Sequence, residues 1–254
     1  MARKVLFYYQ TFNGLQDILH EDPDVTDIHL SSIHFGLEQD GQPYIHLNNY
    51  YPESNKFAQV WTDLERAFDL GINVKVMIGG AGGGYQTLFE RYTECYSLLR
   101  DFLIRHRIIT GIDLDIEEGV DLNKVKLLMT DIKRDFPHYT IAMAPVQSSL
   151  QSDTPGMGGF VYKDLYNSPE GALIDYFNGQ FYSDYSVSAY DQCIKNGYPP
   201  EKVVMGSLNG SGPAEVVHEL SEKYRCFGGV YSWEYSGTPK GWSAEMSDIL
   251  HDLL

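Results

Sequence analysis

Short apolar runs alternate along the chain with longer stretches in which apolar residues recur every three or four positions. The short runs are rich in β-branched and aromatic residues and predict eight strands. They cover residues 5–10, 27–35, 74–79, 111–117, 139–144, 176–182, 203–208 and 229–233. The longer stretches predict helices at residues 58–70, 86–105, 122–136, 214–224 and 243–253. Strands followed by helices indicate parallel strands joined by right-handed crossovers.

Eight such strands, without a phosphate-binding loop in the first unit, favour closure into a (β/α)8 TIM barrel over an open sheet. The 254 residues suit one barrel, so we expect a single domain over 1–254. About twenty residues separate the last two predicted strands. That is enough for one helix and leaves no room for an inserted α+β domain. Residues 36–52 predict a hairpin, with EQDGQP as its turn and YIHLNN as its return strand.

Charge and cysteine content limit the possible partners and the setting. The 19 basic and 35 acidic residues give a net charge of −16, which disfavours nucleic acid and anionic membranes. Cys95, Cys193 and Cys226 show no CxxC spacing, and we expect free thiols. The start, MARKVLFYYQTF, lacks the apolar stretch of a secretory signal. We therefore expect a monomeric cytoplasmic protein, or a secreted one if the sequence is a mature form.

The segment GIDLDIEE, residues 111–118, carries the most informative chemistry. Side chains alternate across a strand, so Asp113, Asp115 and Glu117 share one face while the isoleucines and leucine between them point into an apolar layer. Neighbouring acids then lie roughly 6 to 7 Å apart, at about 3.3 Å per residue. Each disfavours ionisation of the next, which raises at least one pKa and provides a candidate general acid.

Two other kinds of site are compatible with these motifs. Alternating carboxylates could hold calcium or magnesium, and the glycine run GGAGGGY at residues 79–85 could cradle phosphate. The run lacks the Lys-Ser/Thr of a P-loop, so a close backbone approach at the strand mouth is the better interpretation. His29, His34 and His46 lack a third nearby ligand, which favours structural or surface roles over a metal site.

Five segments resemble, in order, the motifs of glycoside hydrolase family 18, the chitinases and their relatives. TGIDLDIE at 110–117 is similar to DGxDxDxE, with Thr110 in place of the first aspartate. IGGAGGG is similar to SxGG, TIAMAPVQ to the MAP segment, and GQFYSD to the QFYN of small plant-type chitinases. YSWEY places Trp233 at the family's tryptophan. The resemblance spans essentially the whole chain.

The resemblance implies a role for each acid. Glu117 would protonate the leaving glycosidic oxygen, and Asp115 would accept the N–H of the substrate acetamide. Tyr182 would donate its hydroxyl to the acetamide carbonyl, and Asp113 would share a proton with Asp115.

The resemblance also implies five substrate-binding or supporting residues. Gln180 would contact the same sugar as Tyr182, Trp233 would form the pocket floor and Met143 would line the wall. Tyr8 would bond the inner aspartates, and Gly80 would contact substrate. No cofactor or metal is implied.

The implied activity is that of a retaining endo-β-N-acetylglucosaminidase of chitinase type, acting on chitin or its oligosaccharides through an oxazolinium intermediate. Cleavage of the chitobiose core of N-glycans and a non-catalytic, lectin-like role remain as alternatives. The natural substrate, the source organism and the reason for Thr110 are not determined by the sequence.

Overall fold

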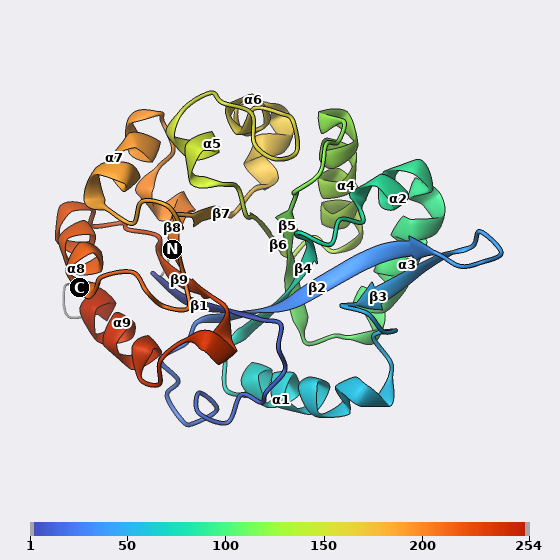
Figure 1. Cartoon of the computed structure of the whole chain (residues 1–254), viewed down its shortest axis with the longest axis horizontal. Helices are drawn as coiled ribbons and strands as arrows, with labels where there is room; N and C mark the ends of the chain where they lie inside the picture. Colours follow the sequence, from blue (N-terminus) through green and yellow to red (C-terminus); the bar gives the residue numbers. More distant parts are fainter. Residues whose placement is uncertain (1–2, 252–254) are drawn as a thin grey trace.

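A computed structural model describes residues 3–251 and shows a closed barrel of parallel strands surrounded by helices (Figure 1). The barrel strands are β1 (Lys4–Tyr9), β2 (Asp27–Leu37), β4 (Asn73–Gly79), β5 (Ile109–Asp115), β6 (Thr140–Met143), β7 (Tyr176–Gln180), β8 (Val203–Leu208) and β9 (Gly229–Trp233). Neighbours pair in this order, and β1 pairs with both β2 and β9. The barrel is therefore closed, which confirms the predicted (β/α)8 fold.

The predicted hairpin is also present. Strand β3 (Pro43–Leu47) pairs antiparallel with the far half of β2, with Phe35 opposite Ile45. With its 11 residues, β2 runs past the barrel wall, and the hairpin projects from the molecule (Figure 1). The hairpin therefore forms one side of the rim above the barrel mouth.

Helices α1 (Ala58–Asp69), α3 (Tyr92–Arg105), α4 (Leu122–Asp135), α7 (Val187–Lys195), α8 (Ala214–Lys223) and α9 (Trp242–His251) surround the barrel, with short α2 (Tyr85–Glu90), α5 (Gln147–Gln151) and α6 (Tyr162–Tyr166). Short 3-10 turns cover Asn55–Phe57, Pro169–Leu173, Pro200–Lys202 and Tyr235–Gly237. The predicted helix 86–105 is two helices, because Arg91 leaves the helical conformation at ψ 43°. The predicted end of the last helix falls partly outside the described residues.

The connection between β8 and β9 contains a single helix, α8, as predicted. Cys95 and Cys193 are buried and Cys226 is exposed, and all three are free thiols, as expected. No helix within residues 3–251 has the length and apolar character needed to cross a membrane.

Two apolar layers form because side chains alternate along each strand. Ile112, Leu114 and Ile116 belong to the outer layer, between the strands and the helices. The inner layer fills the barrel with Leu6, Tyr8, Met77, Ala142, Tyr176, Val204 and Tyr231. The acids of β5 alternate with the outer residues and therefore point into the barrel.

A buried ionic cluster lies toward the start of the strands. Lys75, 2% exposed, pairs with Asp27, which is fully buried, and the ammonium of Lys4 lies 3.3 Å from the same carboxylate. Burial alone would raise the pKa of Asp27, but Lys75 and Lys4 hold it well below its usual range. The carboxylate is therefore ionised inside the barrel, where an unpaired charge is costly.

Candidate active site

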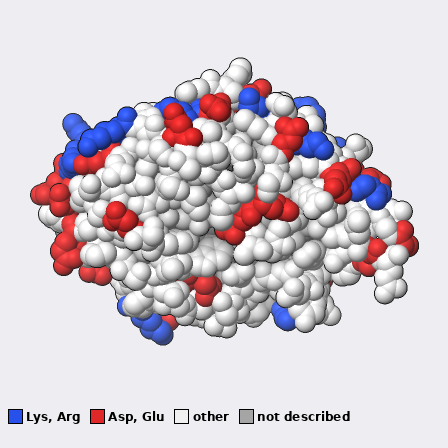
Figure 2. Space-filling view, turned by 45° about the horizontal axis from the view of Figure 1, so that its top comes forward, with Lys and Arg blue, Asp and Glu red and all other residues white. Residues whose placement is uncertain are grey.

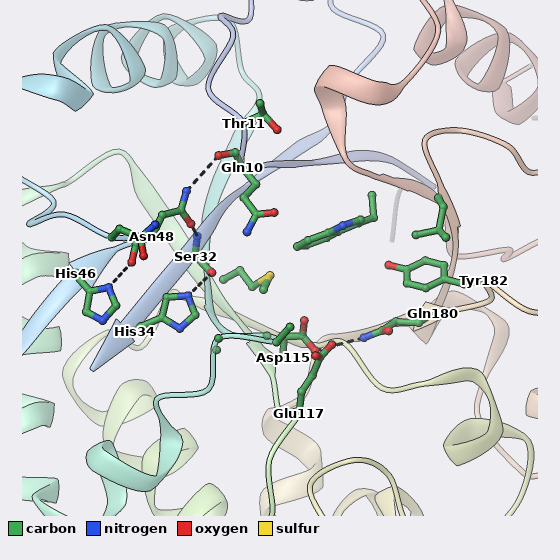
Figure 3. Close-up of a pocket in the computed structure, with 18 residues that line it drawn as sticks. Gln10, Thr11, Ser32, His34, His46, Asn48, Asp115, Glu117, Gln180 and Tyr182 are labelled. Atoms are coloured by element: carbon green, nitrogen blue, oxygen red, sulfur yellow. Dashed lines mark hydrogen bonds between the residues drawn. The ribbon is translucent and has the colours of Figure 1, made fainter. Parts of the chain in front are cut away.

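A cleft of about 620 Å³ opens at the carboxyl ends of the barrel strands. Its lining includes Asp115, Glu117, Gln180, Tyr182 and Trp233, which come from β5, β7 and β9 and from the residues that follow them. In the view of Figure 3, Asp115 and Glu117 lie along the lower edge of the cleft, with Gln180 and Tyr182 on one side and the imidazoles of His34 and His46 on the other. The structure therefore brings together residues that are up to 118 positions apart in the chain.

The three predicted acids ascend one face of β5. Asp113 is fully buried below the cleft, Asp115 is 5% exposed, and Glu117 is half-buried two residues beyond the strand end. Strand alternation places all three on the inner side, because the strand is parallel to both neighbours and its apolar residues face the helices. Glu117 is the outermost, as predicted.

One oxygen of Asp113 accepts three hydrogen bonds. The Tyr8 hydroxyl donates to Oδ2 at 2.5 Å, His29 Nδ1 lies 2.8 Å away, and Asn178 Nδ2 donates at 3.3 Å. Donors that converge on a carboxylate oxygen stabilise its negative charge. The other oxygen, Oδ1, is buried and has no partner among the described residues. The predicted bond from Tyr8 to the inner aspartates is present for one of them, Asp113.

The surroundings of Asp115 and Glu117 favour the protonated form of each carboxyl. Burial, followed by repulsion from Glu117 and Asp113, raises the pKa of Asp115 well above its ordinary value. Burial also raises the pKa of Glu117. Carboxyls in such surroundings keep a proton at a pH where exposed ones have lost it, which is the property required of a general acid.

Gln180 is fixed by two acceptors. Its Nε2 donates to the backbone oxygen of Ala144 at 2.8 Å and to Oδ1 of Asp115 at 3.3 Å. The second bond holds the Asp115 side chain on the Gln180 side of the cleft (Figure 3). Gln180 therefore orients Asp115, in addition to lining the cleft.

Tyr182 is held from below by Tyr231. The two hydroxyls lie 3.2 Å apart, with Tyr231 buried and Tyr182 36% exposed in the cleft. The Tyr231 ring occupies space that Gly206 leaves open, since a Cβ on Gly206 would lie 1.9 Å from Tyr231 Cζ. The absence of a side chain at Gly206 of β8 thus allows the tyrosine pair to form.

Trp233 and Gly80 also occupy the predicted cleft. The Trp233 ring packs 5.0 Å from the Tyr8 ring, on top of the inner apolar layer. Gly80 has a φ of +85°, and its N–H donates to the backbone oxygen of Asp115 at 2.8 Å. A Cβ there would lie 2.7 Å from Met77 and 3.4 Å from Asp115 Oδ2. The glycine run therefore makes the close backbone approach that its sequence indicates.

The prediction that Met143 lines the pocket is wrong. Met143 is fully buried in the outer layer, against the helices, and Ala142 takes the inner position on β6. The methionine that lines the cleft is Met77 of β4. Ile141, Ala142 and Met143 of β6 are all apolar, so polarity alone could not show which of them points inward.

Sequence reasoning also missed several members of the site. Asn178 lies two residues before Gln180, and strand alternation places it on the same inner face. His29 faces the barrel interior, whereas His34 and His46 line the cleft with Asn48 and Gln10. Within residues 3–251, no three His, Cys, Asp or Glu side chains are grouped so that they could hold a metal ion.

No protein-family model matches the chain. Among curated proteins, chitinase 2 of Rhizopus oligosporus is 25% identical over 273 aligned residues, which cover 91% of this chain. The alignment covers 48% of that relative, so the chain spans about half the relative's length.

Two solved structures are similar over nearly their whole length. A fungal endo-β-N-acetylglucosaminidase of glycosyl hydrolase family 18 shares 28% identity at a TM-score of 0.85, with 99% of each chain covered. The chitinase ChiC of Aspergillus fumigatus shares 29% identity at the same TM-score, with 98% of this chain and 100% of that chain covered. The acids of β5 and these relatives agree in supporting a chitinase-like protein of glycoside hydrolase family 18.

Proposed function

We propose that this protein hydrolyses β-1,4 links between N-acetylglucosamine units in chitin or its oligosaccharides, cutting within the chain and retaining the anomeric configuration. One observation carries the proposal. Two carboxyls with raised pKa values, Asp115 and Glu117, line one cleft, and the Tyr182 hydroxyl faces the same space.

In the first step, Glu117 donates its proton to the glycosidic oxygen as the bond from that oxygen to the anomeric carbon breaks. The carbonyl oxygen of the substrate's own acetamide attacks the same carbon and forms a cyclic oxazolinium ion. Asp115 accepts the acetamide N–H and offsets the developing positive charge, while Tyr182 donates its hydroxyl to the acetamide oxygen and orients it. No carboxylate of the protein needs to act as nucleophile.

In the second step, the Glu117 carboxylate removes a proton from water as the water oxygen attacks the anomeric carbon. The bond to the acetamide oxygen breaks, and two inversions give net retention. Asp113, through its unpartnered Oδ1, shares a proton with Asp115 between the steps.

The shape of the cleft supports internal cleavage. Only α8 connects β8 to β9, so no inserted domain rises over the cleft. Figure 2 shows a molecular face on which acidic side chains gather beside a central hollow and basic ones lie toward the margins. Such a face suits a long, uncharged polymer.

Cleavage of the chitobiose core of N-glycans is a second candidate. The observation in its favour is that this chain matches the fungal endo-β-N-acetylglucosaminidase and the Aspergillus fumigatus chitinase with the same TM-score. Both reactions use acetamide participation, so the same residues serve either substrate.

Product analysis tests the proposal. Native protein, Glu117→Gln and the matched control Glu118→Gln are incubated with chitooligosaccharides and with a chitobiose-core glycopeptide, and products are resolved by mass and anomer. We expect β-anomer products of internal cleavage, a 10²- to 10⁴-fold loss in Glu117→Gln, and near-native turnover in Glu118→Gln. The Glu118 carboxylate caps the N–H of Tyr85 and does not line the cleft.

Cleavage of the glycopeptide alone would favour the second candidate. Oligosaccharide binding without turnover in all three proteins would indicate a lectin. Full turnover by Glu117→Gln would disprove the assignment of the acid.

A further inference from the structure

A second hollow lies beside the cleft, along the β2–β3 hairpin and the residues that follow it. Its volume is about 360 Å³, and its lining consists of Glu38, Tyr44, Asn49, Tyr50, Tyr51 and Ser54. Asn49 lines both this hollow and the catalytic cleft. The two spaces are therefore adjacent, so one extended ligand can occupy both. We call this second space the tyrosine hollow.

A row of aromatic rings connects the two spaces. His34 stacks on His46 with centroids 5.3 Å apart and an interplanar angle of 22°, and both line the cleft. Tyr44 lies 5.2 Å from His46 and 5.7 Å from Tyr51, and both tyrosines line the tyrosine hollow. The rings thus form a continuous row from the catalytic cleft to the outer rim.

Packing does not require all of these rings. Tyr51 is 54% exposed and Tyr50 is 49% exposed, whereas most aromatic side chains of the protein are buried. Lys56 lies 3.9 Å over the centre of the Tyr50 ring and occupies one of its faces. Tyr51, which donates its hydroxyl to Glu38, therefore offers the more accessible ring.

The chemistry of the tyrosine hollow matches one class of ligand. Aromatic faces pack against the C–H faces of a pyranose, and nearby polar groups bind hydroxyl and acetamide groups at the sugar edge. Here Asn49, Ser54 and Glu38 provide those groups around the tyrosines. The lining side chains are aromatic or polar, and the one charged side chain among them is the acidic Glu38, which disfavours an anionic ligand.

We propose that the tyrosine hollow is a distal subsite for the same N-acetylglucosamine chain that is cut at Glu117. This inference rests on the proposed function and extends it, because a sugar bound at Tyr51 adds affinity only when the chain reaches from the cleft to the rim. The protein then prefers long oligosaccharides to short ones, and the hairpin sets that preference.

Binding measurements separate this proposal from the catalytic one. Calorimetry in the Glu117→Gln background, with a chitin dimer and a chitin hexamer, compares Tyr51→Ala, Tyr51→Phe and a control, Phe68→Ala. Phe68 is another exposed aromatic, 41% exposed, at the α1 surface. Dimer affinity reports on the cleft, and the ratio of hexamer to dimer affinity reports on the tyrosine hollow.

We expect Tyr51→Ala to weaken hexamer binding about tenfold and to leave dimer binding unchanged. In the protein that keeps Glu117, Tyr51→Ala should leave the turnover of short substrates unchanged. Tyr51→Phe and Phe68→Ala should bind both ligands normally. Equal hexamer affinity in Tyr51→Ala and its parent would overturn the distal subsite while leaving the proposed hydrolysis intact. Loss of dimer binding in Tyr51→Ala would overturn it as well, by showing that Tyr51 acts on the cleft. If the protein that keeps Glu117 hydrolyses no substrate, while Tyr51→Ala still weakens hexamer binding tenfold, only the catalytic proposal is overturned.

Discussion

Nδ1 of His29 lies 2.8 Å from Oδ2 of Asp113, inside the barrel and out of contact with solvent. Burial lowers the pKa of His29, so the ring is neutral. A carboxylate only accepts, so Nδ1 carries the proton and Nε2 accepts from the Tyr176 hydroxyl at 3.1 Å. His29 is therefore a positioning residue, because it stabilises charge on Asp113 without facing the cleft.

Replacing His29 tests that role. His29→Leu removes a donor from Asp113, and His29→Asn keeps an amide N–H near the position of Nδ1. We expect His29→Leu to lower kcat roughly 10- to 100-fold and to move the acidic limb of the pH–rate profile to higher pH, because the less stabilised charge of Asp113 raises the pKa of Asp115 further. His29→Asn should retain most of the native kcat and a nearly native pH–rate profile. A uniform loss of kcat with an unchanged profile in both variants would mean that His29 only packs.

Asp115 should destabilise the fold at neutral pH. Its folded pKa is raised, so the native state holds a proton that the unfolded chain releases near pH 4. Stability therefore falls as the pH rises from about 4 through the folded pKa. Asp115→Asn should raise the free energy of unfolding by on the order of 1–2 kcal/mol at pH 7.5. The gain should be smaller at pH 4.

Urea unfolding at both pH values measures the effect of Asp115→Asn, with the exposed Asp101→Asn of α3 as control. Activity should be lost in Asp115→Asn and kept in the control. Equal stability of Asp115→Asn and native protein at pH 7.5 would contradict the raised pKa.

Gly206→Ala should damage the tyrosine pair. The new Cβ would lie 1.9 Å from Tyr231 Cζ and 2.4 Å from its hydroxyl oxygen, so the ring must move away from Tyr182. Overpacking of this kind costs about 1–3 kcal/mol. We expect reduced thermal stability and a fall in kcat, because Tyr182 loses the partner that orients it. Gly119→Ala is the control, since a Cβ on Gly119 would meet no other atom of the described residues within 4 Å. Native kcat in Gly206→Ala would show that the tyrosine contact is dispensable.

The buried ion cluster should show strong coupling. Asp27→Asn leaves Lys75 inside the barrel without its counter-ion, at a cost of about 3–5 kcal/mol. Asp27→Asn with Lys75→Met removes both charges and should recover much of that loss. A double-mutant cycle by urea unfolding measures the coupling. Additive effects of the two substitutions would argue against a buried charged pair.

The local pattern of apolar and polar residues was enough to predict the barrel and the acidic face of β5. Side chains alternate along a strand, so Asp113, Asp115 and Glu117 share one face independently of the tertiary structure. The family resemblance predicted that Gln180, Tyr182 and Trp233 would lie with these acids, and the fold allows it because parallel strands end on the same side of a barrel. The short helices α5 and α6, of five residues each, were not predicted, because one turn is too short to show a period.

Sequence alone determined the fold class, the shared face of the three acids and the strand ends that carry the site, because these follow from periodicity and chain direction. Only the tertiary structure decided which faces turn inward where both are apolar, and so placed Met77 and not Met143 at the cleft. It also decided that His29 and Asn178 converge on one oxygen of Asp113, and that Asn49 joins the cleft to the tyrosine hollow. The physical reason is that these contacts depend on the register between strands far apart in the chain, and no local pattern encodes that register.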